Sequence, residues 1–323
     1  MHRYIARRVI MLIPVIIGVS FLVYFLMDMA PGDIIDVIGQ EYSEDYIEEL
    51  REKLGLDRSV FYRYFLFMKG LLTGDMGYSY SYDAPVWDLY SQRIPYTLQL
   101  AVGSILVCVV LSLPLGIIAA LQHGKLVDNG CSVLAILGLS IPNFWLGLLL
   151  IILFAQILGW LPSYGAEDGL KSLILPSLTV GTGMMATMTR TTRSSMLDVL
   201  SSDYLRTARA KGVRENAVVT KHGLRNALIP IITVFGTQLG SCFGGAVITE
   251  NVFSWPGVGQ LMVSGIKKRD TTLVCGFIIM SVIMISVVQL VVDILYAYVD
   301  PRLRSQYASP SKKKNTGKGG AKA

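Results

Sequence analysis

Charged residues are scarce in this chain of 323 residues, and this scarcity is the first indication of its class. Only 16% of the residues are charged and 52% are hydrophobic, whereas a soluble domain usually carries about a quarter charged residues. The charges that are present gather in blocks between long uncharged runs. An ordinary soluble globule is therefore excluded, and the pattern indicates a polytopic membrane protein.

Histidine and cysteine are few, and their spacing predicts neither a metal site nor a disulfide framework. The three histidines, His2, His123 and His222, lie far apart in the sequence. All four cysteines lie inside apolar runs, where we expect them to act as small buried hydrophobes. They are Cys108, Cys131, Cys242 and Cys275. We therefore expect no metal ion and no cofactor.

Motifs for ATP binding and for catalysis are also missing. The pairs Gly124-Lys125 and Gly317-Lys318 stand without the rest of the phosphate-binding pattern G-x-x-x-x-G-K-[ST]. The apolar runs hold no acid pairs, Ser/Lys pairs or clustered histidines, so we expect no intramembrane enzyme and no catalytic residue. Proton- or sodium-driven carriers usually keep an ionisable residue near the midplane. Here the acids lie toward the ends of the runs, at Asp28, Glu250, Asp293 and Asp300. A secondary carrier or channel is thus the more distant alternative.

Six uncharged runs are long enough to cross a membrane, which takes about 20 residues for ~30 Å of hydrocarbon. They cover residues 9–27, 97–121, 131–158, 172–189, 226–249 and 271–292. The run 172–189 is the weakest candidate, because it is short and rich in Pro, Gly and Thr. Three arginines precede the first run, as in a signal peptide, but no A-x-A-like cleavage site follows, so we predict a retained anchor. The expected fold is all-α, with six transmembrane helices and a small extracytoplasmic element after the first.

Basic residues are distributed unequally between the two sides that six spans would create. One side carries 19 Lys and Arg residues, whereas the short loops on the other side carry four. The positive-inside rule therefore predicts that both termini are cytoplasmic. The predicted organisation is an N-terminus with the first span (1–30), an extracytoplasmic segment (31–94), a five-span core (95–300) with a cytoplasmic loop at 190–226, and a tail (301–323). The tail is basic and glycine-rich, which predicts disorder and attraction to anionic membrane lipid.

The predicted extracytoplasmic segment holds twelve acidic and six basic residues, together with patterns that form structure. "SEDYIEELREKLG" predicts a helix that Ser43 caps and Gly55 ends. Its apolar face consists of Ile47, Leu50 and Leu54. "VFYRYFLFMKGLL" suits a helix at the membrane interface, with a stripe of Phe61, Tyr64, Phe65 and Met68, and "GYSYSY" alternates like a short strand. A docking surface and a cap on the bundle are both open interpretations.

Residues 203–225 form an internal block with eight charged residues, six of them basic. A short helix is predicted over 203–211, with Ser202 as its cap and Gly212 at its end. A second helix follows from about 214 to 221. A DNA-reading helix-turn-helix has a similar outline, but membrane spans on both sides argue against nucleic acid. An ordinary solvated loop is the alternative. The loop is far longer than the roughly 2–8 residues usual in bundles, which favours a folded element presented to a partner.

Two stretches of this block, "YLRTARAKG" and "HGLRNALIP", follow the spacing E-A-A-x3-G-x9-I-x-L-P. This pattern is the cytoplasmic "EAA" loop of bacterial binding-protein-dependent ABC importer permeases, and the chain resembles their dipeptide/oligopeptide/nickel subgroup. The resemblance extends to "RTTRSSMLDVL", "IPNFWLGLLL", "ENVFSWPGVGQL", "DPRLR", "LGLDRSV" and "GDMGYSY", over about residues 1–305. Alignment on Gly212 leaves two departures, since Arg206 replaces the acid of the pattern and Arg225 replaces its proline.

The resemblance implies a type I ABC importer permease of the bacterial inner membrane, which supplies half of the translocation path for di- or oligopeptides. Its expected partners are a related second permease, one or two separate ATP-binding subunits, an extracytoplasmic substrate-binding protein and membrane lipid. The loop is expected to form a coupling helix that sits in a groove of an ATP-binding subunit. The residues expected to form this contact are Asp203, Arg206, Thr207, Ala208, Arg209, Gly212, His222 and Leu224.

Polar residues within the predicted spans are candidates to line the translocation path. They are Asn143, Gln238 and Ser241. Hydrogen bonding between helices is an equally good interpretation. The candidates for the outer mouth are Trp255, Pro256 and Gly257, with an interfacial anchor as the alternative role of the tryptophan. Peptides, nickel and another small solute stay open as substrates, and the scarcity of histidine and acids in the spans favours peptides.

Overall fold

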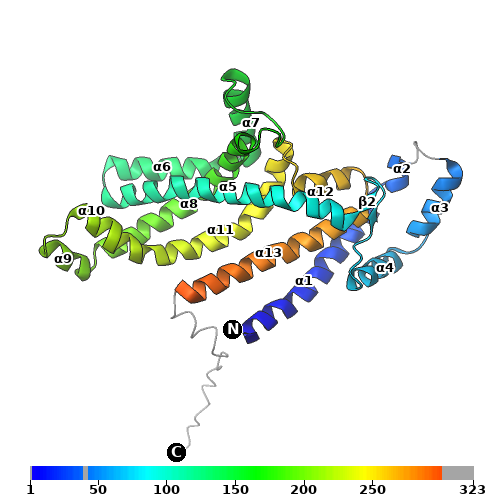
Figure 1. The fold of residues 1–323 in the computed structure, drawn as a ribbon, viewed down its shortest axis with the longest axis horizontal. Helices are drawn as coiled ribbons and strands as arrows, with labels where there is room; N and C mark the ends of the chain where they lie inside the picture. The colour runs from blue at the N-terminus through cyan, green and yellow to red at the C-terminus, as the bar shows by residue number, and fades with distance from the viewer. Residues whose placement is uncertain (1, 39–42, 300–323) are drawn as a thin grey trace, which may run out of the picture.

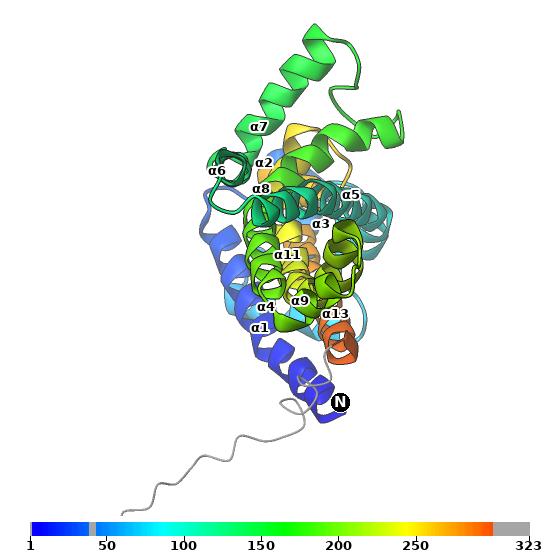
Figure 2. The same ribbon diagram turned by 90° about the vertical axis from the view of Figure 1, so that its left-hand side faces the viewer.

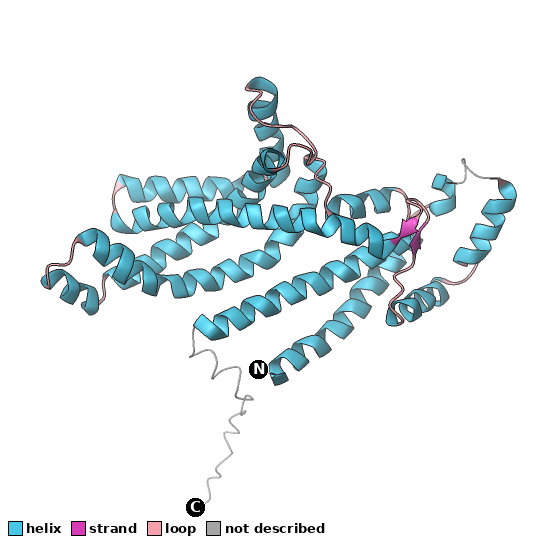
Figure 3. Ribbon diagram, in the orientation of Figure 1, coloured by secondary structure: helices cyan, strands magenta, loops and turns pink. Residues whose placement is uncertain are grey.

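Helices make up nearly all of the regular structure in the computed structural model (Figures 1 and 3). The structure describes residues 2–38 and 43–299. In this part of the chain the strands are β1 (Tyr78–Ser79) and β2 (Ala84–Pro85), which pair antiparallel. The predicted tail at 301–323 and the motif "DPRLR" lie outside the described residues.

Six helices carry the predicted spans and run back and forth along one direction (Figure 1). They are α1 (His2–Met29), α5 (Val86–Leu121), α6 (Leu126–Ser140), α8 (Leu170–Leu200), α11 (Arg225–Val252) and α13 (Thr271–Val299). By length and composition, three of them could cross a membrane alone, namely α1, α5 and α13. The protein is therefore a helical protein with several membrane-spanning segments, and the count of six spans stays a prediction.

The predicted third span is not one continuous helix. α6 ends at Ser140, α7 (Asn143–Leu150) begins after Pro142, and the two helices are bent by 100°. A proline ring fixes φ and disfavours helical conformation in the residue before it, and Ile141 is extended, with φ −85° and ψ 123°. A π-helical segment, η2 (Ile151–Ile157), continues α7. Figure 2 shows this arm standing away from the other helices, so residues 131–158 form a bent pair of helices, and a single span there stays a prediction.

The largest core lies where α5 and α8 pack against each other and against α11. Gly116 of α5 faces Thr192 of α8, and a Cβ at Gly116 would come within 2.5 Å of the threonine Cβ. Such close approach of small residues is how helices gain packing contacts in a membrane. The space between the helices is filled by buried side chains that include Met184, Met188, Met196, Cys242 and Phe243.

The segment after α1 forms three helices and the hairpin, as its sequence predicts in part. The helices are α2 (Ile34–Ile38), α3 (Glu44–Leu54) and α4 (Val60–Leu72). Gly55 ends α3 with φ 62°, and Leu50 is buried against α2, so both predictions are confirmed. Ser43 has the backbone of a cap but makes no capping hydrogen bond. On α4, Tyr64 contacts Ser20 of α1 at 2.9 Å, whereas Phe61 and Phe65 remain exposed.

Two ends of the bundle can be distinguished (Figure 1). The loop end holds α9 (Asp203–Ala210), α10 (Glu215–Ala217) and η3 (Val218–Leu224), and the start of α1 and the end of α13 point toward it without reaching it. The hairpin end holds α2 to α4, β1 and β2, and α12 (Val258–Lys267) lies toward it. The arrangement places the charged block and the first residues of α1 on one side. The cytoplasmic orientation of that side stays a prediction.

Candidate functional site

A glycine turn closes the helix of the charged block. α9 ends at Ala210, and Gly212 has a φ of 79°. Its N–H donates to the Arg209 carbonyl at 2.9 Å, and the next N–H donates to the Ala208 carbonyl at 3.3 Å. Residues with a Cβ rarely adopt this left-handed conformation. A Cβ at Gly212 would meet nothing within 4 Å, so the position needs glycine for its backbone angle and not for room.

An ion pair spans this turn. Arg209 donates to both carboxylate oxygens of Glu215, with Nη2–Oε1 at 2.8 Å and Nε–Oε2 at 3.1 Å. The hydrogen bonds from Arg209 lower the pKa of Glu215, and those to Glu215 raise the pKa of Arg209. Because the side chains are 37% and 59% exposed, solvent screens the pair. Arg209 is thus engaged within the block, a contact that the sequence did not predict.

The inner face of α9 is anchored on the bundle. Leu205 is fully buried, and it lies beside Gly223 of η3, which also has Met196 of α8 as a neighbour. η3 then runs into α11 without a break, so the predicted end of the second helix near residue 221 is wrong. Gly223 lies within η3 and is buried, and the helix continues past this glycine. The inner face of α9 therefore rests on η3, and η3 in turn lies beside α8.

The outer face of α9 carries the exposed residues that the sequence predicted. Arg206 and Asp203 are 74% and 97% exposed and lie 3.7 Å apart, a long ion pair, and Thr207 is also exposed. Ala208 is half-buried, as are His222 and Leu224 of η3. The predicted cap at Ser202 is wrong in its chemistry, because the hydroxyl donates to the Val199 carbonyl at 2.5 Å and makes no capping bond.

A second site lies inside the bundle, beside the break between α6 and α7. A hollow of about 270 Å³ is bounded there by α6, α7, α8 and α11, and its lining includes Asn143 and Gln238. Gln238 also donates to the Met184 carbonyl at 3.3 Å. The remaining lining residues are Leu139, Val180, Gly183, Met184, Thr187 and Cys242. The structure thus brings together two of the three predicted path residues. The Ser241 side chain lies outside the described part.

The loop after α11 encloses a buried carboxylate that the sequence did not single out for a role. Glu250 is fully buried, and it accepts hydrogen bonds from Thr97 Oγ1 at 2.7 Å and from the Gln260 N–H at 3.0 Å. A Cβ at Gly257 would overlap Glu250 Oε1. Trp255 is 1% exposed and donates to the Tyr96 carbonyl at 2.9 Å. The Trp255 ring is therefore packed inside the subunit, and the interpretation of Trp255 as an interfacial anchor is wrong. Of the three predicted mouth residues, Trp255 and Gly257 are buried and Pro256 is half-buried.

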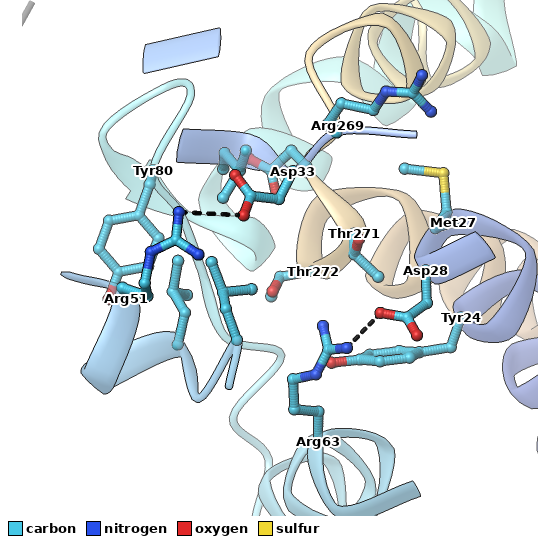
Figure 4. Close-up of a pocket in the computed structure, with 15 residues that line it drawn as sticks. Tyr24, Met27, Asp28, Asp33, Arg51, Arg63, Tyr80, Arg269, Thr271 and Thr272 are labelled. Carbon is cyan, nitrogen blue, oxygen red and sulfur yellow. Dashed lines mark hydrogen bonds and ion pairs between the residues drawn. The ribbon is translucent and has the colours of Figure 1, made fainter. Parts of the chain in front are cut away.

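A polar pocket of about 200 Å³ opens at the hairpin end, between the end of α1, the start of α13 and the segment that carries α2 to α4 (Figure 4). Two ion pairs cross it, one between Arg63 and Asp28 and one between Arg51 and Asp33 at 3.6 Å. Behind it, Asp270 is buried and accepts hydrogen bonds from the hairpin hydroxyls of Ser79 at 2.6 Å and Ser81 at 2.7 Å. These contacts tie the segment after α1 to the start of α13.

A buried ion cluster at the loop end was missed by the sequence reasoning. Asp128, at the start of α6, accepts two hydrogen bonds from Arg193 of α8, at 2.6 Å from Nε and 2.7 Å from Nη2. His123 Nδ1 lies 3.2 Å from the carboxylate and 3.0 Å from Arg193 Nη2. The guanidinium and then the Gly124 N–H hold the pKa of Asp128 well below its usual range. No local pattern predicts this cluster, because its partners are 65 residues apart.

Comparison with known proteins shows that the chain as a whole is similar to one family. Residues 112–305 match the family described as "Binding-protein-dependent transport system inner membrane component", and residues 1–101 match the N-terminal part of such membrane components. The "Oligopeptide transport system permease protein AppB" of Bacillus subtilis is 40% identical over 314 residues, which cover 94% of this chain and 99% of that protein. The "Glutathione transport system permease protein GsiC" of Escherichia coli K12 is 42% identical over 305 residues, with the same coverage.

A solved structure shares the fold. A chain of the inward-facing MetNI methionine ABC transporter superposes with a TM-score of 0.56 at 19% identity, over 66% of this chain and 96% of that chain. A second crystal form of that transporter gives a TM-score of 0.55 at 22% identity. The two chains therefore share the arrangement of their helices over about two thirds of this chain.

Proposed function

Because the chain belongs to the family of binding-protein-dependent transport system inner membrane components, we propose that it forms half of a peptide-import pathway and receives its energy through α9. It is a transport component and not an enzyme. A related second permease supplies the other half of the path, and one or two separate ATP-binding subunits hydrolyse ATP. The loop end then faces the cytoplasm, as the excess of basic residues there supports.

The geometry of the α9 turn carries this proposal. Gly212 stands at the position of the glycine of the loop pattern, and its φ of 79° fixes the direction in which the chain leaves α9. Leu205 anchors the inner face of α9, which leaves Arg206 and Thr207 exposed on the outer face. A short, rigid helix with one anchored and one free face suits insertion into a groove of an ATP-binding subunit. A rigid-body movement of that subunit can then be passed to the spans.

The proposed translocation path runs past the hollow between α7, α8 and α11. Asn143, Gln238 and Thr187 line it with amide and hydroxyl groups, and none of its described lining residues is charged. Such groups can form hydrogen bonds with the amides of a peptide backbone. Nickel prefers nitrogen ligands such as imidazole, which this lining does not offer. Together with the oligopeptide and glutathione permeases among its relatives, this supports a short peptide as the substrate.

The external segment 31–94 is proposed to receive the substrate-binding protein. α3 exposes a row of carboxylates that can attract a basic surface of such a protein. They are Glu44, Asp45, Glu48, Glu49 and Glu52. The test replaces them with glutamine and measures ATP hydrolysis stimulated by the binding protein at increasing salt. An unchanged affinity and salt dependence would leave the segment as a cap on the bundle.

Reconstitution tests the function as a whole. The chain, its second permease, its ATP-binding subunits and the binding protein are placed in vesicles, and ATP hydrolysis is measured with dipeptides, glutathione or Ni²⁺. We expect stimulation by peptides and none by the metal ion. Stimulation by Ni²⁺ alone would reject the peptide assignment. Gln238→Leu should lower peptide uptake, while Gln156→Leu, an exposed amide on the arm, serves as the matched control.

The coupling role has its own test. Ala208→Trp adds bulk to the proposed contact, and Gly212→Asp forces a side chain into the left-handed turn, at a cost of roughly 1 kcal/mol or more. Neither change alters a membrane span, so we expect normal membrane levels with reduced copurification of ATP-binding subunits and reduced uptake. Gly165→Asp is the control, because Gly165 has a φ of 77° in an open loop elsewhere. Normal uptake by both variants would reduce the block to a basic loop.

A further inference from the structure

The ion cluster at the loop end joins two helices that no covalent turn connects directly. Asp128 lies in the first turn of α6 and Arg193 lies on α8, two turns before that helix ends at Leu200. The guanidinium meets both carboxylate oxygens, and the Asp128 side chain is only 4% exposed. A bidentate guanidinium–carboxylate pair fixes orientation as well as distance. Replacing either residue leaves the charge of the other unpaired, so the loss of one residue removes the whole interaction.

This pair stands between the two proposed functional regions. On one side, Leu205 of α9 and Met196 of α8 both lie beside Gly223 of η3, each within 4 Å of the place that a Cβ would take there, so η3 links α8 to the charged block. On the other side, α6 leads from Asp128 to the break before Asn143, which lines the hollow. A second close contact joins the same helices nearer the break, where a Cβ at Gly138 would lie 2.8 Å from the Thr182 carbonyl. α6 is therefore clamped to α8 at two levels.

We infer that the Asp128–Arg193 pair is a positioning contact that makes α6 move with α8, so that a displacement of α9 reaches the Asn143 wall of the translocation path. This inference rests on the proposed coupling role of α9. Neither residue touches substrate or ATP. They keep the Asn143 wall of the hollow at a fixed position relative to the loop end, through a chain of packed and hydrogen-bonded groups.

The test separates coupling from assembly. Asp128→Asn, Arg193→Gln, the double variant and the conservative Arg193→Lys are each purified with the complete complex and compared for ATP hydrolysis and for peptide transported per ATP. We expect both single variants to retain the ATP-binding subunits and their ATP hydrolysis, but to transport roughly tenfold less peptide per ATP. The double variant should be no worse than either single variant, because contacting residues are not additive. Arg193→Lys should recover part of the wild-type amount of peptide transported per ATP.

Lys125→Gln is the matched control, because it removes an exposed charge in the same turn and should leave the ratio unchanged. A second readout is the distance between spin labels on Leu134 of α6 and Asp198 of α8, both exposed. In the wild-type complex this distance should stay constant when ATP is added, and in Asp128→Asn it should change. A normal transport ratio in Asp128→Asn and Arg193→Gln, or additive losses in the double variant, would overturn the inference. If the wild-type chain itself fails to bind ATP-binding subunits, the proposed function fails instead.

Discussion

The loop end and the hairpin end of this molecule accommodate buried carboxylates in different ways. At the loop end, Asp128 is paired with the guanidinium of Arg193, while the neighbouring charges of α9 lie exposed. At the hairpin end, Glu250 and Asp270 accept hydrogen bonds from hydroxyl groups and backbone N–H groups among the described residues. Gly257 and Gly259 lie close to the Glu250 carboxylate, and the hydroxyls of Ser79 and Ser81 donate to the Asp270 carboxylate.

The two ways of satisfying a buried carboxylate have different consequences for local rigidity. A carboxylate enclosed by neutral donors on several elements is held in one arrangement, because each donor is fixed by its own backbone. An ion pair between two helices instead keeps those helices together while they move as a body. Exposed charges on α9 remain available to a partner. We therefore propose that the hairpin end is the more rigid end, and that the loop end transmits movement.

The largest effect is expected at Gly257. A Cβ there would overlap the buried Glu250 carboxylate, although the backbone angle of Gly257, with φ −91°, suits any residue. Gly257→Val should therefore abolish accumulation of the subunit in the membrane, measured by immunoblot of membrane fractions. Gly212→Ala, which strains the backbone in open space, should cost only about 1 kcal/mol and leave the level normal. Equal levels of the two variants would contradict the contrast between the ends.

A smaller loss is expected when Asp270 loses its carboxylate. One oxygen caps α13 through the Leu273 N–H at 3.0 Å, and the other binds the hairpin serines. Removing an N-cap of this kind costs about 0.5–2 kcal/mol. Asp270→Ala should therefore lower the unfolding temperature of the purified complex and increase protease cleavage near the hairpin. Asp270→Asn should recover part of the loss, since its amide oxygen can still cap the helix. Asp57→Ala, at an exposed position, is the control.

Exposed charges at the loop end should matter less for stability than for partner binding. Arg206→Ala breaks only a long, exposed pair with Asp203, and such pairs contribute about 0–1 kcal/mol. We expect an unchanged unfolding temperature and a modest loss of copurified ATP-binding subunits, by less than about threefold. Arg209→Ala should have a larger effect on copurification, because it also releases Glu215 and loosens the turn. A drop in unfolding temperature for Arg206→Ala would show that its charge serves the fold.

The smallest effect is expected for a change of pH on the difference in unfolding temperature between wild type and Asp128→Asn. The pKa of Asp128 is held well below its usual range by Arg193, so its pairing contributes stability above the pKa of an unfolded aspartate, about 3.9, and loses it as pH falls through the lower folded value. The difference in unfolding temperature between wild type and Asp128→Asn should therefore stay constant from pH 8 to pH 5. A difference that changes between pH 8 and pH 5 would contradict this expectation.

Turns and helices with local causes were predictable from the sequence. Gly55 and Gly212 adopt the left-handed conformation that their places after helical patterns indicate. The apolar face of α3 is buried as its spacing predicts. Residue type alone misled where packing decided. Tryptophan is common in interfacial anchors, but Trp255 is packed against Tyr96. The apolar run 131–158 is bent by 100° at Pro142, an angle that its residue types do not encode.

The sequence by itself determined that this is a helical membrane protein with a charged, folded block, because hydrophobic length and glycine stops act through neighbours in the chain. The tertiary structure alone decided how the buried carboxylates are satisfied. Asp128 meets Arg193 across 65 residues, Thr97 meets Glu250 across 153, and Ser79 meets Asp270 across 191. A hydrogen bond between residues so distant in the chain depends on how whole helices pack, and no pattern within either segment encodes that.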